Sequence, residues 1–309
     1  MATLKELSMK EIKFTGGTRT CAGCAAPIIV KQVLLAAPHN PVIINATGCL
    51  YITTAIIPYS SWRTPYYHSA FENAAAVASG VEGAVRALKR KGMLGDRTYD
   101  VIAIGGDGGT YDIGLQAISG MLERGHRCLY ICYDNGAYMN TGIQRSGSTP
   151  FGAWTTTSHV GEAQKGKPQH QKDMIQIAAA HGAYAASASP HRWRDLMQKV
   201  EKALNYEGPS FINIQSPCPR GWRYPASETI KIARLATETC IFPLYEVEEK
   251  GEKWTVNYIP KNKLPVAEYL KPQGRFEHFF RPGNEHLLEE LQAETDRRWN
   301  RLLRLAGIA

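Results

Sequence analysis

Two sets of residues in this chain have types and spacings that suit chemistry. The first is the run Gly105-Gly106-Asp107-Gly108-Gly109, which is followed further along by Asp134-Asn135. Glycines let a backbone approach a phosphate closely, and the amides at a helix N-terminus favour an anion. A carboxylate at Asp107 would repel a phosphate unless it holds a divalent cation such as Mg²⁺, which prefers oxygen ligands. Asn135 would supply a second, neutral oxygen ligand, so the pair predicts a magnesium diphosphate site.

Two other interpretations of the glycine run stay open at this point. One is a glycine-rich turn between a strand and a helix, followed by an unrelated Asp-Asn turn. The other is a dinucleotide fingerprint, but the stretch from Gly106 to Tyr111 lacks the final glycine of that motif. Asn135 follows the next predicted strand, as a second metal ligand should, and this favours the metal site.

The second set consists of the four cysteines Cys21, Cys24, Cys49 and Cys218. Cys21 and Cys24 form a CxxC pair, whereas the other two are single residues that each follow a predicted strand. An iron–sulfur site, a zinc site and unrelated thiols are all compatible with this spacing. A zinc ribbon usually has a second CxxC or a histidine pair, and neither is found. Residues 16–20 do not resemble the strand that should precede a thioredoxin-like CxxC.

The elements that must position these residues alternate between strands and helices. Strands are predicted at 41–46, 99–104, 127–133 and 211–214. Helices are predicted at 74–91, 113–124, 172–181 and 193–206. Mostly apolar strands that alternate with helices predict an α/β fold, with a parallel sheet covered on both faces. Ligands bind such sheets outside the carboxyl ends of the strands, and both residue sets follow predicted strand ends. Cys128 and Cys132 lie within a strand and are predicted to be core residues.

The remaining segments differ from this pattern. Residues 140–167 are rich in Gly, Ser, Thr and Pro, and we expect an ordered functional loop there because the segment is too long for a simple connection. Residues 241–258 alternate like a hairpin, and the chain closes with an amphipathic helix that Asn284 is expected to cap. We therefore divide the chain into a core domain, 1–240, and a C-terminal extension, 241–309.

The composition limits the class of protein. Of 309 residues, 44% are hydrophobic and 21% are charged, which is ordinary for a globular chain. No stretch is apolar over the roughly 18 residues that a membrane span needs, and residues 1–15 lack the apolar core of a signal peptide. With an odd count of seven cysteines, these features predict a cytoplasmic location. The net charge is +8, but no nucleic-acid-binding motif accompanies it.

Six stretches resemble the β subunit of 2-oxoacid:ferredoxin oxidoreductases, most closely the pyruvate type. They are CAGCAAPI at 21–28, NATGCL at 45–50, AFENAAAVASG at 70–80, IGGDGGTYDIGLQAISG at 104–120, YICYDNGAYMNTGIQRSGSTPFGAWTTTS at 130–158 and PCPRGW at 217–222. The resemblance implies a thiamine-diphosphate-binding fold that carries thiamine diphosphate, Mg²⁺ and one [4Fe-4S] cluster. It also implies oxidative decarboxylation of a small 2-oxoacid, pyruvate above all, with electrons passing through the cluster to ferredoxin.

The resemblance also implies roles for individual residues. Those that match the cluster ligands are Cys21, Cys24, Cys49 and Cys218. Those that match the magnesium ligands and the diphosphate loop are Asp107, Asn135, the carbonyl of Ala137, Gly106 and Gly108. Asn140 matches a catalytic residue near the thiamine and substrate, with a loop hydrogen-bonding role as the alternative. Cys49, His68 and Asn73 are expected to approach the cofactor; for His68 the alternative is a core or interface histidine.

One departure from the family concerns the substrate. Pyruvate-type relatives commonly read DNEAYMNTG where this chain has Gly136 in place of the acidic residue. Losing a carboxylate there would suit the doubly charged oxalate, so an oxalate oxidoreductase β subunit, which does not use coenzyme A, is an alternative. A zinc-stabilised, non-catalytic assembly subunit and a cluster-free thiamine decarboxylase are two more.

The chain also lacks part of the machinery that the family needs. It has a single diphosphate-binding half and no second α/β repeat that could supply a carboxylate to the aminopyrimidine of the cofactor. We therefore expect that carboxylate from another subunit of the same enzyme, of the α, γ or δ type, and expect this chain to be inactive alone.

Overall fold

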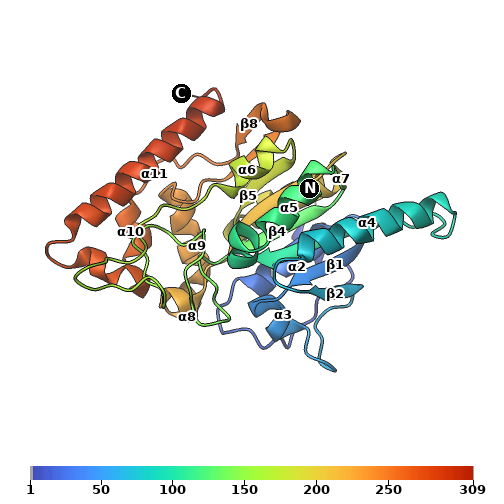
Figure 1. Cartoon of the computed structure of the whole chain (residues 1–309), viewed down its shortest axis with the longest axis horizontal. Coiled ribbons are helices and arrows are strands. Elements are labelled where there is room, and N and C mark those ends of the chain that lie inside the picture. Colours follow the sequence, from blue (N-terminus) through green and yellow to red (C-terminus); the bar gives the residue numbers. More distant parts are fainter. Residues whose placement is uncertain (1–2, 309) are drawn as a thin grey trace.

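One mostly parallel sheet forms the centre of the molecule, with helices on both faces (Figure 1). The computed structural model describes residues 3–308. The strands are β1 (Asn40–Ala46), β2 (Tyr66–Ser69), β3 (Tyr99–Gly106), β4 (Leu129–Asp134), β5 (Tyr184–Ala188), β6 (Ser210–Gln215), β7 (Tyr245–Glu248) and β8 (Lys253–Val256). Their order within the described residues is β2-β1-β3-β4-β6-β5-β7-β8. Among these strands the β5–β7 and β7–β8 pairs are antiparallel, and the other pairs are parallel. The predicted fold class is confirmed.

The helices cover the sheet in two layers. The helices are α1 (Leu4–Ser8), α2 (Ala26–Ala36), α3 (Cys49–Thr54), α4 (Ala74–Arg90), α5 (Leu115–Glu123), α6 (Met174–Ala180), α7 (Trp193–Asn205), α8 (Pro219–Trp222), α9 (Thr229–Glu238), α10 (Val266–Leu270) and α11 (Glu285–Leu305). Successive residues of a strand point to opposite faces, so Ile43 packs in the core beneath α2 and α7, and Ile44 in the core beneath α4 and α5. Both side chains are fully buried, as expected for a strand covered on two sides.

Four neighbouring parallel strands bring the predicted site residues to one edge of the sheet. β1, β3, β4 and β6 lie side by side, and their carboxyl ends lead into Cys49, Asp107, Asn135 and Cys218 respectively. Gly106 pairs with Tyr133, and Asp134 pairs with Gln215, so the last residues of these strands are in register. The two residue sets identified from the sequence therefore converge at one edge.

The C-terminal extension adds to this sheet. β7 pairs with β5, and β8 pairs with β7, so the sheet continues across the boundary predicted at residue 240. The division into two domains stays a prediction. The predicted helix cap is wrong in detail: Asn284 occupies the N-cap position of α11, but its side chain donates to the carbonyl oxygen of His278 at 2.7 Å instead of accepting from the helix.

The segment from 140 to 167 contains no helix or strand among its described residues, as predicted. It is nevertheless well packed, because residues 146–153 are all buried. Lys167 is buried within it and donates to the carbonyl oxygen of Thr149 at 2.6 Å. Within residues 3–308, no helix is both long enough and apolar enough to cross a membrane.

Candidate active site

A narrow cleft opens at the carboxyl edge of the sheet. The predicted site residues that line it are Cys49, Gly106, Gly108, Asn135, Ala137 and Asn140. Asp107 lies beneath the cleft and is fully buried. The structure thus brings together residues from the ends of β1, β3 and β4 in one place.

Three oxygen atoms converge at the base of this cleft. The side-chain oxygen of Asn135 lies 3.0 Å from Oδ1 of Asp107 and 2.9 Å from the carbonyl oxygen of Ala137. None of these atoms carries a hydrogen in this orientation of the amide. Rotation of the Asn135 amide would form two hydrogen bonds, whereas a bound cation would favour the oxygen-facing orientation. A hard cation such as Mg²⁺ prefers this set of carboxylate, amide and carbonyl oxygens.

Buried negative charge surrounds this base. Asp107 accepts hydrogen bonds from Ser146 Oγ at 2.5 Å and from the backbone N–H of Asn135 at 3.2 Å. Burial raises the pKa of Asp107 well above its usual range, and the nearby Asp134 raises it further. Burial also raises the pKa of Asp134. Two buried carboxyl groups are costly when ionised without a cation, so the site is electrostatically suited to one.

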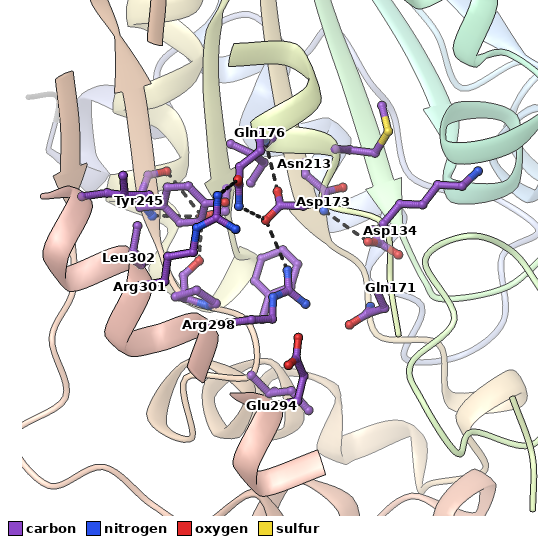
Figure 2. Close-up of a pocket in the computed structure, with 18 of the residues that line it drawn as sticks. Asp134, Gln171, Asp173, Gln176, Asn213, Tyr245, Glu294, Arg298, Arg301 and Leu302 are labelled. Atoms are coloured by element: carbon purple, nitrogen blue, oxygen red, sulfur yellow. Dashed lines mark hydrogen bonds and ion pairs between the residues drawn. The ribbon is translucent and has the colours of Figure 1, made fainter. Parts of the chain in front are cut away.

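Asp134 is held from the side away from the cleft. Its carboxylate accepts hydrogen bonds from Ser148 at 2.5 Å and Tyr111 at 3.0 Å, and from the amide of Asn213 at 3.2 Å. Figure 2 shows Asp134 and Asn213 at the inner side of a second cavity, into which Arg298 extends from α11. This cavity shares no lining residue with the cleft. The network fixes the end of β4 just before Asn135.

The glycines of the loop are required by close aromatic neighbours. A Cβ atom at Gly108 would lie 2.4 Å from the ring of Tyr138, and one at Gly106 would lie 3.3 Å from the ring of Tyr133. The Tyr138 hydroxyl donates to the carbonyl oxygen of Gly108 at 3.0 Å. The chain then makes a π-helical turn, Gly108–Asp112, before α5. A helical turn opened by glycines is suited to a phosphate group.

The four cysteines of the second set also lie close together. Burial raises the pKa of Cys24 to about 12 and that of Cys49 to about 11, and in both cases the nearby Cys218 and Cys21 thiols add to the shift. Yet among residues 3–308 no three His, Cys, Asp or Glu side chains are close enough to hold one metal ion.

Cys218 and Asn135 are linked through α8. The backbone N–H of Gly221 donates to Cys218 Sγ at 3.3 Å, and the backbone N–H of Trp222 donates to the Cys218 carbonyl at 2.9 Å. The indole N–H of Trp222 donates to the carbonyl oxygen of Asn135 at 2.6 Å. A Cβ atom at Gly221 would lie 2.3 Å from Met139 Sδ, so a larger residue there would require the Met139 side chain to move.

Of the three residues that were expected to approach the cofactor, two lie outside the cleft lining. His68 stacks on Tyr51 with ring centroids 3.5 Å apart, and its Nε2 lies 2.8 Å from Thr47 Oγ1. Asn73 is exposed at the beginning of α4. Their cofactor roles stay predictions. Cys128 and Cys132 are buried in β4 or beside it, as predicted.

Sequence reasoning missed several residues of the site. Phe71, Tyr133 and Tyr138 line the cleft, and Trp222 connects it to Cys218. These aromatic residues match no chemical motif, but Tyr133 and Tyr138 flank the Asp-Asn pair closely, and Trp222 follows Cys218 by one helical turn. Proximity to predicted ligands was the available signal.

Residues 46–214 match the family model of the thiamine pyrophosphate enzyme C-terminal TPP-binding domain. Pyruvate synthase subunit PorB of Thermotoga maritima is 53% identical over 98% of this chain and 95% of its own length. PorB of Methanocaldococcus jannaschii is 56% identical over 87% of this chain and 90% of its own. Ketoisovalerate oxidoreductase subunit VorB of Pyrococcus abyssi is 44% identical over 96% and 94%.

A solved structure shares the fold. The structure of 2-oxoglutarate:ferredoxin oxidoreductase from Magnetococcus marinus, with 2-oxoglutarate, coenzyme A and succinyl-CoA bound, matches with a TM-score of 0.54. The match covers 72% of this chain and 79% of that one, at 21% sequence identity. At this identity the similarity concerns the fold alone.

Proposed function

This chain belongs to the family of thiamine-diphosphate-dependent 2-oxoacid:ferredoxin oxidoreductase β subunits, and from that membership we propose that it oxidises pyruvate within a multi-subunit enzyme. The observation that carries the proposal is the convergence of oxygens from Asp107, Asn135 and Ala137 beside a glycine loop. Together they form an oxygen-ligand set for Mg²⁺, beneath a loop suited to a diphosphate.

The residues of this chain bind and orient. Asp107, Asn135 and the Ala137 carbonyl would hold Mg²⁺, while the backbone at Gly106 and Gly108 would approach the diphosphate. Asn140 lines the same cleft and would position the substrate. Tyr133 and Tyr138 line the cleft beside the glycine loop and would limit the access of water. Thiamine diphosphate supplies the electron sink for decarboxylation when it is bound.

We assign Cys21, Cys24, Cys49 and Cys218 as the ligands of a [4Fe-4S] cluster. Their mutual proximity supports this assignment, because these thiols lie near enough to raise one another's pKa. Cys49 also lines the cleft, so one ligand would contact both the cofactor site and the cluster. Electrons released in the cleft would therefore have a short route out, with ferredoxin as their acceptor. Finding one zinc and no iron in the protein would refute this assignment.

A partner subunit would complete the site. Large apolar side chains remain exposed on and after α3, the helix that begins at Cys49: Ile52 is 44% exposed, Ile57 is 89% exposed and Tyr59 is 72% exposed. Exposed apolar side chains that gather in one region are typical of an interaction surface. We propose that another subunit covers this region and brings the carboxylate that the aminopyrimidine needs. The isolated chain would then be inactive.

Substrate profiling of the assembled complex tests the proposed function. Pyruvate should be oxidised with reduction of ferredoxin, whereas oxalate and 2-oxoglutarate should be poor substrates. The oxalate alternative depends on the missing carboxylate at Gly136, and preferential turnover of oxalate without coenzyme A would replace pyruvate in the proposal. Turnover of any 2-oxoacid by the isolated chain would contradict the proposed need for a partner.

A further inference from the structure

Arg275 is a buried cation beside both halves of the site. Only 2% of its surface is exposed, and within residues 3–308 it forms no ion pair with a carboxylate. Its polar partners are neutral: Gln273 Oε1 at 2.9 Å and the Tyr269 hydroxyl at 3.4 Å. The guanidinium group lies over the ring of Trp222, 3.8 Å from the centroid. An arginine that is buried with neutral partners alone is unusual.

Burial of this charge has an energetic cost. A charged group loses its hydration on burial, and neutral hydrogen-bond partners recover only part of that loss. Burial lowers the pKa of Arg275, but a guanidinium stays protonated at any physiological pH. A positive charge therefore persists in the interior, and a negative charge nearby would stabilise it.

The surroundings indicate where that negative charge lies. Trp222, on which Arg275 stacks, is bonded through its backbone to Cys218 and through its indole to Asn135. Nη1 of Arg275 lies 3.0 Å from the position that a Cβ atom would take at Gly136. The buried Asp134 carboxyl group and the Cys218 thiol are both among the groups whose charge acts on Arg275. Burial raises the pKa of the Cys218 thiol, and the guanidinium offsets a small part of that rise.

We propose that Arg275 is the buried counter-charge of the iron–sulfur cluster, a positioning residue that raises the cluster's reduction potential and holds Trp222 against Cys218 and Asn135. The inference rests on the proposed function, because it needs the cluster at Cys218. A cluster held by four thiolates is negatively charged and gains a further negative charge when it accepts an electron. A fixed cation in a region of low dielectric stabilises the reduced form more than the oxidised form.

The residue at position 136 decides whether the charge of Arg275 is neutralised. Any carboxylate introduced at that position would extend toward Arg275 and neutralise it. With glycine there, the charge of Arg275 remains available to the cluster. This assigns Gly136 a role in the electrostatics of electron transfer that is separate from substrate choice.

The first test replaces Arg275 in the assembled enzyme, purified without oxygen. Iron content is measured first, and the midpoint potential of the cluster is then measured by dye-mediated titration of its visible absorbance. Arg275→Gln, which removes the charge but keeps a planar polar group, should weaken reduction about tenfold, a fall of about 59 mV for a one-electron couple. Arg275→Lys, which keeps the charge, should restore most of the potential.

Arg223→Gln is the matched control. Arg223 also stacks on a tryptophan, Trp154, at 3.7 Å, but it is exposed and therefore screened by water. Its loss should leave the potential unchanged. An unchanged potential in Arg275→Gln, or an equal fall in Arg275→Gln and Arg275→Lys, would overturn the inference. Absence of iron from the wild-type complex would instead overturn the proposed function.

A second pair of variants covers the case in which Arg275→Gln fails to assemble. Asp and Asn have nearly the same shape, and both tolerate the positive φ of 72° at Gly136 better than most residues. Gly136→Asp should lower the midpoint potential relative to Gly136→Asn, because only Asp neutralises Arg275. Equal potentials in these two variants would overturn the inference as well.

Discussion

The side-chain oxygen of Asn135 lies 3.0 Å from Oδ1 of Asp107, although neither atom carries a hydrogen. The two residues follow neighbouring parallel strands, β4 and β3, so the sheet itself fixes the approach of the two side chains. The Ala137 carbonyl contributes a third oxygen on the same side. A bound cation would favour this oxygen-facing orientation over the rotated amide, which would donate to both acceptors. This set of atoms is the structural basis of the proposed Mg²⁺ and diphosphate site.

Removing the charge of Asp107 should weaken the proposed site. Asp107→Asn keeps the shape of the side chain but loses the anionic ligand, so we expect Mg²⁺-dependent binding of thiamine diphosphate to the complex to weaken by at least roughly tenfold. Calorimetric titration of the complex measures this. Asp112→Asn, on the same turn but paired with Lys172, is the control and should bind normally. Unchanged affinity in Asp107→Asn would argue against the assigned ligand.

Adding a methyl group at Gly108 should close the cleft. The new Cβ would lie 2.4 Å from the Tyr138 ring, and Tyr138 is held by its own hydrogen bond to Gly108. We expect a loss of cofactor binding and a destabilisation of about 1–3 kcal/mol, as for other overpacked positions. Gly83→Ala on α4 has open space around it, and should raise the free energy of unfolding by about 0.5–1 kcal/mol. In thermal unfolding, Gly108→Ala should therefore lower the melting temperature and Gly83→Ala should raise it.

Loss of a proposed cluster ligand should appear in the iron content. Cys218→Ser should purify with little or no cluster, because serine is a poor substitute for a thiolate ligand. Cys240→Ser is the matched control, since Cys240 is buried but lies in a different core from the cysteine set. Iron analysis and visible absorbance under nitrogen distinguish the two. A full complement of iron in Cys218→Ser would remove that residue from the ligand set.

Stability should depend on pH through His191. Burial lowers the pKa of His191 to about 4, helped by the nearby Arg192 and Arg234. The unfolded chain takes up a proton below the ordinary pKa of 6.5, and the native chain does so only near 4. The free energy of unfolding should therefore fall as the pH drops from 6.5 to 4, by on the order of 2 kcal/mol from this residue.

Denaturant unfolding of His191→Gln at several pH values isolates this contribution. The variant should lose less stability than the wild type across the interval, while His286→Gln, at an exposed position on α11, should follow the wild type. Identical pH profiles for wild type and His191→Gln would show that His191 is not the responsible group.

The alternation of strands and helices was predictable from hydrophobic periodicity, and part of the site was predictable from the polar residues that follow the strand ends. Asp107 and Asn135 each follow an apolar run, and parallel strands must end at a common edge. β5 was missed because its Tyr-Ala-Ala-Ser-Ala sequence lacks β-branched residues, although every residue of it is buried. Asn284 was assigned as a cap from its residue type, but its amide has a nearby carbonyl partner at His278 that a local pattern does not reveal.

The connection between the two halves of the site was beyond the reach of sequence patterns. Trp222 is near Cys218 in the chain, but its bond to Asn135 depends on how β4 and α8 pack together. Arg275 comes from a part of the chain that the sequence assigned to the C-terminal extension, and only the tertiary structure brings it against Trp222. Hydrophobic periodicity in the sequence does not predict long-range contacts among residues that belong to no motif.

In the proposed enzyme, the cleft and the cysteines act as one electron route. Pyruvate is added anaerobically to the assembled enzyme in the absence of ferredoxin, and the visible absorbance of the cluster is followed in wild type and in Asp107→Asn with its iron intact. We expect bleaching of the cluster in wild type that depends on thiamine diphosphate, and no bleaching in Asp107→Asn. Decarboxylation of pyruvate by the wild-type enzyme with the cluster left oxidised would contradict this electron route.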